Sequence, residues 1–284
     1  MLRSSALRSF RMAAWLGWQI ESNWTDPFLF AIYSIIKPLA AAGILVIMYR
    51  VVSQQAFDTP MFAYLYLGNA FYQYVSAVTT GVSWAVIDDR EHYRTLKYIY
   101  VAPLNIPLYL FGRGIARFLT TTFAVLIIIA FGVWLLKMPL SLASIDWPLF
   151  LVSLLLGTIM LALVGLLLAG VTLLTARHSY YIGDAVAGAL FLFTGAIFPL
   201  EVLPAYLRPI GYALPITYWL ELMRRALVGQ VAQAFPTFSN VSSAQLLGWL
   251  ALMTLALGVV SWAVFRWCER VAREQGLIDY TSNY

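Results

Sequence analysis

Long apolar stretches alternate with short polar ones along the chain, and this pattern predicts membrane-spanning helices. A helix that crosses a bilayer needs about 20 mostly apolar residues. Six windows reach or approach that length: Phe28–Tyr49, Met61–Ile87, Phe118–Leu136, Trp147–Ala176, Ala185–Leu200 and Leu246–Phe265. The fifth window is the shortest and ends in a proline-containing stretch. We expect an all-α polytopic membrane protein with six transmembrane helices, forming a single permease domain over residues 1–284.

The first residues predict a helix that lies on the membrane instead of crossing it. Arg3, Arg8 and Arg11 precede a short apolar run, Met12–Ile20. That run has the length of a signal-peptide core, but no small-residue cleavage site follows it. Tryptophans at headgroup level beside arginines are typical of an interfacial helix. We expect residues 1–26 to form an amphipathic helix at the cytoplasmic interface.

The basic residues indicate how the chain is oriented in the membrane. If both termini are cytoplasmic, 12 of the 18 Lys and Arg residues fall in cytoplasmic segments and 5 on the opposite side. Cytoplasmic loops of membrane proteins carry an excess of Lys and Arg. The bias therefore predicts six spans with both ends in the cytoplasm of a cell inner or plasma membrane.

Four prolines interrupt the chain before the last window, at Pro199, Pro204, Pro209 and Pro215. Each proline removes a backbone donor and clashes with the preceding turn, so one continuous helix is excluded. The residues between them are too apolar for a free loop. We expect short broken helices over residues 199–228 that re-enter the outer leaflet, where they are buried in protein or line a wet cavity.

Composition supports a membrane protein and excludes several other classes. The chain is 62% hydrophobic and 11% charged, whereas soluble domains are about 45–50% apolar and about 25% charged. The net charge is +5, but the basic residues are scattered at the ends of apolar stretches, so we expect no nucleic-acid partner. One cysteine and two histidines cannot build a disulfide or a typical metal cluster.

Motifs for catalysis are missing from the sequence. It contains neither a Gly-x-x-x-x-Gly-Lys-Ser/Thr loop for nucleotide phosphates nor a Gly-x-Ser-x-Gly elbow. Acid pairs, which a proton-driven carrier or a hydrolase would need at depth, are almost absent from the apolar windows. We expect no catalytic residues and no cofactor in this chain, and an energy source that lies in another protein.

The densest run of charge, residues 88–103, separates two of the apolar windows. Tyr93, Leu96 and Tyr100 recur at a spacing of three and four residues, which favours a helix with a narrow apolar stripe. Charged residues flank that stripe: Glu91, Arg94 and Lys97. We expect a short cytoplasmic helix with its apolar side towards the protein and its charges towards the cytoplasm. A solvated interfacial loop is the alternative.

Two motifs make the chain resemble permeases of the type-two ATP-binding-cassette exporter family. The first is the family's "RE…G-T-L…P" segment after the second span, carried here by Arg90, Glu91, Thr95, Leu96 and Pro103. The second is the external segment before the last span, carried here by Pro199, Leu200, Leu203, Pro204, Pro215, Tyr218 and Arg224. The family often has glycine where this chain has Arg94.

The resemblance implies a membrane subunit driven by separate ATPase subunits. It implies a homodimer, or a pair of similar permeases, docked on two ATPase subunits that bind ATP and Mg. The segment after the second span then acts as a coupling helix that sits in a cleft of the ATPase, and the N-terminal helix contacts the same partner. The candidate coupling residues are Asp89, Arg90, Glu91, Tyr93, Arg94, Thr95, Leu96, Lys97 and Tyr100.

Polar and aromatic residues within the windows are candidates for a substrate pathway. They are Lys37, Asn69, Tyr72, Gln73, Phe191 and Phe193. Bonding between helices accounts for the polar ones equally well. Lys37 is explained more simply by snorkelling, or by a carbonyl that Pro38 frees.

The proline-rich external segment is the candidate gate. Its candidate residues are Pro199, Glu201, Pro204, Arg208, Pro215, Tyr218, Glu221 and Arg224, with Arg225 beside them. We expect its charged residues to pair and to hold the gate shut, which requires partial burial because exposed pairs contribute only about 0–1 kcal/mol.

The function predicted from these features is outward, ATP-driven transport of an amphipathic molecule, either a drug-like compound or a lipid. A lipid-linked polysaccharide is the alternative cargo. An ATP-independent carrier and a membrane scaffold are the alternative classes.

Overall fold

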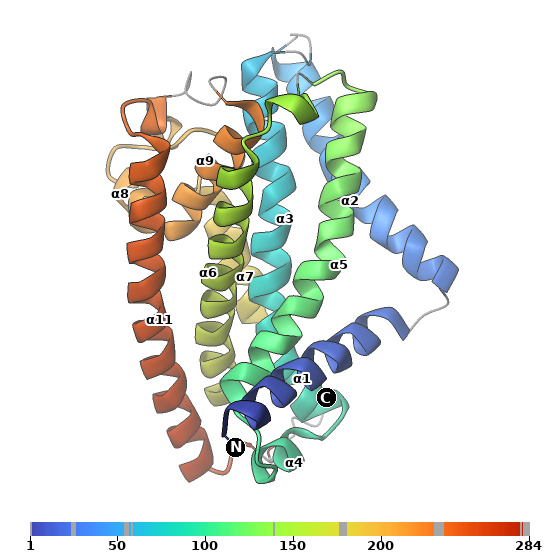
Figure 1. The fold of residues 1–284 in the computed structure, drawn as a ribbon, viewed down its shortest axis with the longest axis vertical. Helices are drawn as coiled ribbons and strands as arrows, with labels where there is room; N and C mark the ends of the chain where they lie inside the picture. The colour runs from blue at the N-terminus through green and yellow to red at the C-terminus, as the bar shows by residue number, and fades with distance from the viewer. Residues whose placement is uncertain are drawn as a thin grey trace.

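Long helices packed along one axis dominate the fold (Figure 1). The computed structural model describes residues 2–23, 27–53, 57, 59–138, 140–175, 181–229, 236–278 and 280, and every regular element in these ranges is a helix. The five longest bundle helices are α2 (Pro27–Ser53), α3 (Pro60–Ile87), α5 (Ile106–Trp134), α6 (Trp147–Leu174) and α11 (Ser243–Glu274). In Figure 1, α2 leans away from the other four at its N-terminal half.

Shorter helices occupy both ends of the bundle. The end that we call the α4 end carries α1 (Leu2–Asn23), the π-helix η1 (Asp88–His92), α4 (Leu96–Val101) and the C-terminal end of α11 (Figure 1). The remaining elements are η2 (Leu142–Ser144), α7 (Ile182–Phe193), η4 (Leu200–Val202), α8 (Arg208–Ala213), α9 (Pro215–Val228) and η5 (Pro236–Phe238). We call the end with η2, α8 and η5 the α8 end.

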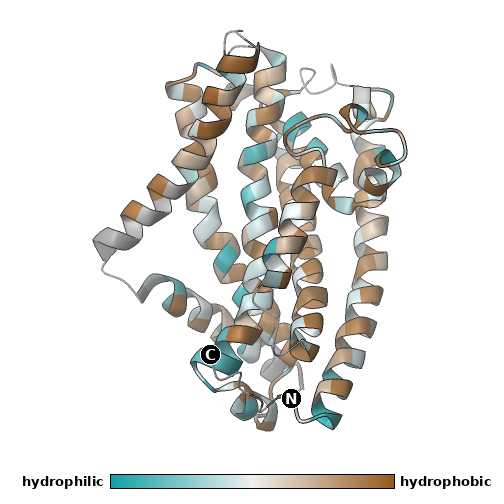
Figure 2. Cartoon of the chain, turned by 180° about the vertical axis from the view of Figure 1, so that it is seen from behind, coloured by the Kyte–Doolittle hydropathy of each residue, from teal (hydrophilic) through white to brown (hydrophobic). Residues whose placement is uncertain are grey.

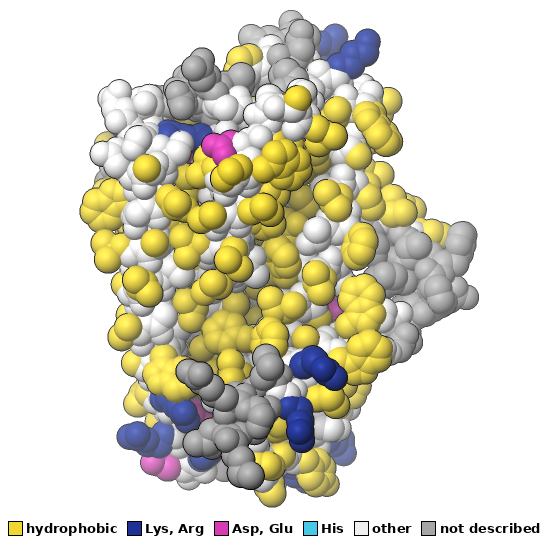
Figure 3. Space-filling model, in the orientation of Figure 1, with side chains coloured by type: hydrophobic (Ala, Val, Ile, Leu, Met, Phe, Trp, Pro, Cys, Tyr) yellow, Lys and Arg dark blue, Asp and Glu magenta, His cyan; other side chains and the backbone are white. Residues whose placement is uncertain are grey.

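Within the described ranges, three helices, α5, α6 and α11, are long and apolar enough to cross a membrane. Figure 2 shows hydrophobic residues along the long helices, and hydrophilic residues at the ends and at several positions in the middle of the bundle. On the face seen in Figure 3, hydrophobic side chains cover the middle, and most Lys and Arg side chains lie at the α4 end. The chain is therefore an all-helical, membrane-embedded protein. Each of the six predicted windows overlaps a helix.

α5 begins well before the apolar window Phe118–Leu136. The helix starts at Ile106, after Asn105 caps its first turn, and it includes Arg113 and Arg117. Both arginines are inside the helix because acidic residues of other elements pair with them. A window of apolar residues leaves such charges out and therefore starts the helix too late.

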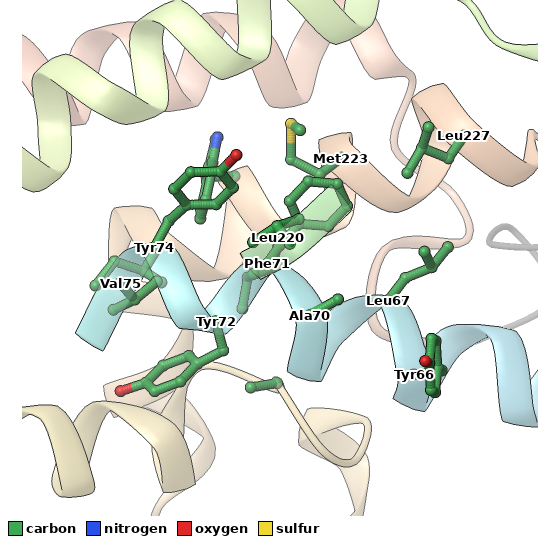
Figure 4. Packing of buried hydrophobic residues seen from close by; sticks show 14 of the residues in the cluster. Tyr66, Leu67, Ala70, Phe71, Tyr72, Tyr74, Val75, Leu220, Met223 and Leu227 are labelled. Carbon is green, nitrogen blue, oxygen red and sulfur yellow. The ribbon is translucent and has the colours of Figure 1, made fainter. Parts of the chain in front are cut away.

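α3 is the centre of the packing, and most of its residues are buried. It contacts α5, α6, α7 and α9. On one side, Phe71 meets the Trp219 ring of α9 edge to face, with centroids 6.2 Å apart. Figure 4 shows Tyr72 on the other side of α3, directed towards α7, whose Phe191 ring lies 4.6 Å away.

The proline-rich segment forms short helices, as predicted. Pro199 precedes η4, Pro209 lies in the first turn of α8, and Pro215 begins α9. Each helix thus starts where a proline needs no intrahelical partner for its nitrogen. The depth of these helices in the bilayer stays a prediction.

A buried arginine fixes this segment to α3. Arg224 of α9 is 1% exposed, and its guanidinium donates to the carbonyl oxygens of Tyr64, Gly195 and Ala196 at 3.1, 2.7 and 3.2 Å. The same group lies 3.7 Å from the centroid of the Tyr64 ring. Gly68 makes room for this contact, because a Cβ there would lie 2.1 Å from both the Ala196 oxygen and an Arg224 nitrogen.

We expect Gly68→Ala to lower the melting temperature of the purified protein, since its methyl group would displace Arg224 or the α7 end. Gly248→Ala in α11 is the matched control, because a Cβ there meets no atom within 4 Å. An alanine at an open helical site is neutral or stabilising by up to about 1 kcal/mol. Thermal unfolding in one detergent would measure both, and equal melting temperatures would contradict the proposed close contact.

Candidate coupling site at the α4 end

The charged segment after α3 is not the single helix predicted for residues 88–103. Asp88–His92 prolongs α3 as a π-helix, and a separate helix, α4, follows at Leu96–Val101. Arg94 lies between them with a φ of 53°, in the left-handed region. That conformation costs a residue with a side chain about 1 kcal/mol or more, which is why glycine is the usual choice there. The prediction of one helix was wrong because the chain turns at Arg94.

A buried ion pair holds η1 against α5. Asp89 is 2% exposed and accepts from Arg113 Nη1 at 3.2 Å and from the Tyr109 hydroxyl at 2.8 Å. Asp88 adds a second carboxylate 3.7 Å from Arg113. Burial raises the pKa of the Asp89 carboxyl, and the charge of Arg113 opposes that rise. The cluster joins the end of α3 to the first turns of α5.

A second buried contact joins η1 to α6. Arg90 is 2% exposed, donates to the Thr172 carbonyl at 3.3 Å and pairs with Glu91 at 3.0 Å. Thr172 lies in the last turn of α6, where carbonyl groups have no intrahelical partner and attract a cation. Asp89 and Arg90, two of the candidate coupling residues, are therefore buried, and the side chain of Glu91, which was predicted to face the cytoplasm, is covered by Arg90. The partners of Asp89 and Arg90 come from α5 and α6, which adjacent residues in the sequence do not reveal.

α4 has one side towards the protein and one side open. Leu96 is 4% exposed and Tyr100 is half-buried, whereas Tyr98 is exposed and Val101 is 88% exposed. Thr95 precedes the first turn, and its hydroxyl donates to the Asp89 carbonyl at 3.4 Å. Of the predicted apolar stripe, Leu96 and Tyr100 face the protein. Exposed positions on the same segment are Tyr93, Arg94 and Lys97.

α1 lies against α5 and completes the site. A helix was predicted here, and its position at the membrane interface stays a prediction. Small residues four apart meet on the two helices, Ala13 and Gly17 on α1 and Gly112 and Ala116 on α5. Such small-xxx-small pairs let two backbones approach closely. An ion pair of 2.8 Å between Glu21 of α1 and Arg117 of α5 adds to the contact, and burial raises the Glu21 pKa while Arg117 opposes the rise.

Between α1 and α4 lies an apolar groove with a volume of about 460 Å³. Its lining residues are Ser9, Met12, Ala13, Trp15, Leu16, Thr95, Tyr98, Ile99, Ala102, Leu104 and Tyr109. Exposed basic residues occur on both helical segments that form it, Arg8 and Arg11 on α1 and Arg94 and Lys97 beside or within α4. The site is therefore an apolar cleft with basic residues on both sides.

The candidate pathway residues that the structure describes lie on α3 and α7, and one pair of them joins the two helices. Tyr72 donates from its hydroxyl to the Ala187 carbonyl of α7 and packs on Phe191. Asn69 is buried, and its Nδ2 atom has no hydrogen-bond partner among the described residues. Gln73 and Phe193 are half-buried. The side chain of Lys37 lies outside the described part.

The candidate gate residues are bonded mainly to backbone and to their own helix. Arg208 donates to the carbonyl groups of Leu203 and Glu201, at 2.9 and 2.7 Å. The Glu201 carboxylate accepts from Tyr212 and Thr237. Pro204 is exposed, and the Tyr218 hydroxyl donates to the Tyr212 carbonyl at 3.0 Å.

The acidic and basic residues of α9 do pair, as predicted. Glu221 lies 2.9 Å from Arg225 and 3.9 Å from Arg224. All three are buried, and Arg225 also donates to the carbonyl groups of Val241 and Phe238. The burial that a gate would need is present. The ion pairs lie within α9, and the bonds from Arg225 to the two carbonyl groups hold α9 against the segment before α11.

Comparison with known families assigns the class. The family model described as ABC-2 type transporter matches residues 10–228. This match spans α1 to α9 and includes the coupling site, so the chain belongs to the ABC-2 type transporter family. It is a membrane permease component of an ABC transporter, and the family implies an ATPase partner in the transporter complex. A search of curated proteins returned no match to this chain.

Sequence reasoning missed Tyr109, Arg113 and the α1 residues that line the groove. One signal for Arg113 was present, because two consecutive aspartates follow one apolar window and two arginines, Arg113 and Arg117, precede the next. Opposite charges at the facing ends of two windows favour a pair between them.

We expect Asp89→Asn to lower the free energy of unfolding by about 1–3 kcal/mol, because the buried Arg113 would keep less of its counter-charge. Asp184→Asn on the exposed face of α7 is the control for the same chemical change. Denaturant unfolding of both variants in detergent would measure the difference. Equal stabilities would show that Asp89 does not hold α5.

Proposed function

We propose that this chain is the permease of an ATP-driven exporter, and that the groove between α1 and α4 receives an apolar surface of a separate ATPase subunit. The groove is the observation that carries the proposal. Its lining is almost wholly apolar, and the exposed Tyr98 and Val101 continue that surface outward. An apolar core with a charged rim is the usual anatomy of a protein interface. A lipid-facing role alone would not explain why α4 lies at the polar end.

The proposed partner supplies the ATP chemistry. The sequence has no phosphate-binding loop, so ATP and Mg would be bound by the partner, in two copies. A partner can move the permease only through contacts that differ between its states. Asp89 and Arg90 fix η1 to α5 and α6 through buried contacts, and Thr95, just before α4, donates to the Asp89 carbonyl. A displacement of α4 would therefore be transmitted through η1 into the bundle.

The arrangement in the membrane follows from the same proposal. The six apolar helices would be six spans with both termini in the cytoplasm, which agrees with the basic residues at the α4 end (Figure 3). A second copy of the chain would complete the transporter in the cell inner or plasma membrane. The segment from Pro199 to Arg224 would then lie on the external side and act as its gate.

The cargo that fits this description is an amphipathic molecule that moves outward. Asn69, Tyr72 and Gln73 of α3, with Phe191 and Phe193 of α7, combine aromatic rings with polar atoms, which suits a drug-like compound or a lipid. A lipid-linked polysaccharide is the second candidate, since aromatic side chains also bind sugars.

Aspartate in the groove tests the docking proposal. We expect Leu16→Asp and Tyr98→Asp to reduce co-purification of the ATPase subunit about tenfold or more, because each would bury a carboxylate in an apolar interface. The amount of the subunit, and the ATP hydrolysis that it carries, would be measured after affinity purification from native membranes.

The matched control is Tyr206→Asp, which alters an equally exposed tyrosine before α8. It should leave the complex intact. Undiminished ATPase subunit in both groove variants would reject the docking site. Transport by the purified chain alone, driven by an ion gradient, would reject the function itself.

A further inference from the structure

The chain turns back sharply after α11, and a defined motif makes this turn. Gly276 has a φ of 67°, the Leu277 N–H donates to the Ala272 carbonyl at 2.9 Å, and the Gly276 N–H donates to the Arg273 carbonyl at 3.2 Å. These are the two hydrogen bonds of a Schellman motif, in which glycine takes the left-handed position. The sequence after α11 is therefore directed back towards the bundle.

The reversed segment packs on the core that also holds α4. Leu277 and Ile278 contact the buried cluster at the α4 end, and that cluster contains Leu96 of α4 and Ala272 of α11. An apolar contact beside a Schellman turn is the usual companion of this motif. The C-terminal turn thus extends the same apolar core that Leu96 enters.

A charged side chain of α11 reaches α4 directly. The Arg273 guanidinium lies 5.0 Å from the centroid of the Tyr100 ring, within the range of a cation–π contact. Glu269, one helical turn earlier, pairs with Arg273 at 2.9 Å and orients it. Burial raises the pKa of the Tyr100 hydroxyl, which keeps the ring neutral beside this charge pair.

The contact with α11 and most of the groove lining lie on different sides of α4, with Ile99 at the boundary of both. Tyr98 and Ala102 line the groove and are four residues apart, so they share one side of the helix. Leu96 and Tyr100 are also four apart, and at about 100° per residue they lie roughly opposite. A force on the groove side would therefore press α4 towards Arg273 and the C-terminal turn.

We infer that residues Arg273 to Ile278 are a brace that positions α4, so that a partner bound in the groove moves the bundle instead of displacing α4 alone. This inference rests on the proposed coupling function and adds a positioning element to it. The brace lies outside residues 10–228, which the family model matches.

Amide hydrogen exchange of the purified complex tests the brace. In a variant with Leu277→Asn and Ile278→Asn, we expect the amides of α4 to exchange about tenfold faster, because local opening of a helix is set by its packing contacts. The amides of α5 should exchange at the unchanged rate. The rate of ATP hydrolysis per complex should fall by at least about twofold while co-purification is retained.

Arg273 provides a second test with a conservative rescue. Arg273→Gln should raise α4 exchange about threefold, in line with the loss of one cation–π contact, and Arg273→Lys should restore most of the protection. Arg270→Gln, an exposed arginine on the same helical turn, is the control and should change nothing.

The outcomes separate the brace from the proposed function. Unchanged α4 exchange in the double variant overturns the brace, even if the wild-type complex contains an active ATPase subunit. Faster exchange with unchanged ATP hydrolysis also overturns it, because α4 would then be held without any effect on coupling. An ATPase subunit missing from the wild-type preparation refutes the proposed function. The exchange rates of α4 then still show whether the C-terminal turn holds α4 in place.

Discussion

The fold at the α4 end depends on the buried ion pair between Asp89 and Arg113. Taking two charges out of water is costly. The Tyr109 hydroxyl offsets part of this cost by donating to the Asp89 carboxylate, and Asp88 does so by adding a second carboxylate near Arg113. This pair allows α5 to begin far before its apolar stretch. It also fixes where α3 ends, and so determines where α4 can lie.

α3 connects the two ends of the molecule, and a buried arginine secures each end. Arg90 joins η1, which prolongs α3, to the end of α6, while Arg224 joins the other end of α3 to α9 and the turn after α7. Both arginines donate to backbone carbonyl oxygens, so each one joins its own helix directly to the backbone of another element. Because packed interiors are stiff, α3 is a rigid connection between these two anchored ends.

The α4 end combines a rigid part with an open one. Asp89, Arg90 and Leu96 are buried in the bundle, whereas the groove between α1 and α4 is an open apolar surface. The C-terminal turn packs on the same buried cluster that Leu96 of α4 enters. A short helix of six residues could not keep its position by itself, since isolated helices of this length are unstable in water.

The sequence by itself determined the helical membrane class, the amphipathic α1, the breaks at Pro199, Pro209 and Pro215, and the family resemblance. These follow from local properties: apolar length, charge placement and the geometry of proline. Only the tertiary structure decided that Asp89 and Arg90 are buried against α5 and α6, and that Arg273 reaches Tyr100. Each of those contacts joins residues distant in sequence, and the free energy of a buried charge depends on the partner that the fold supplies.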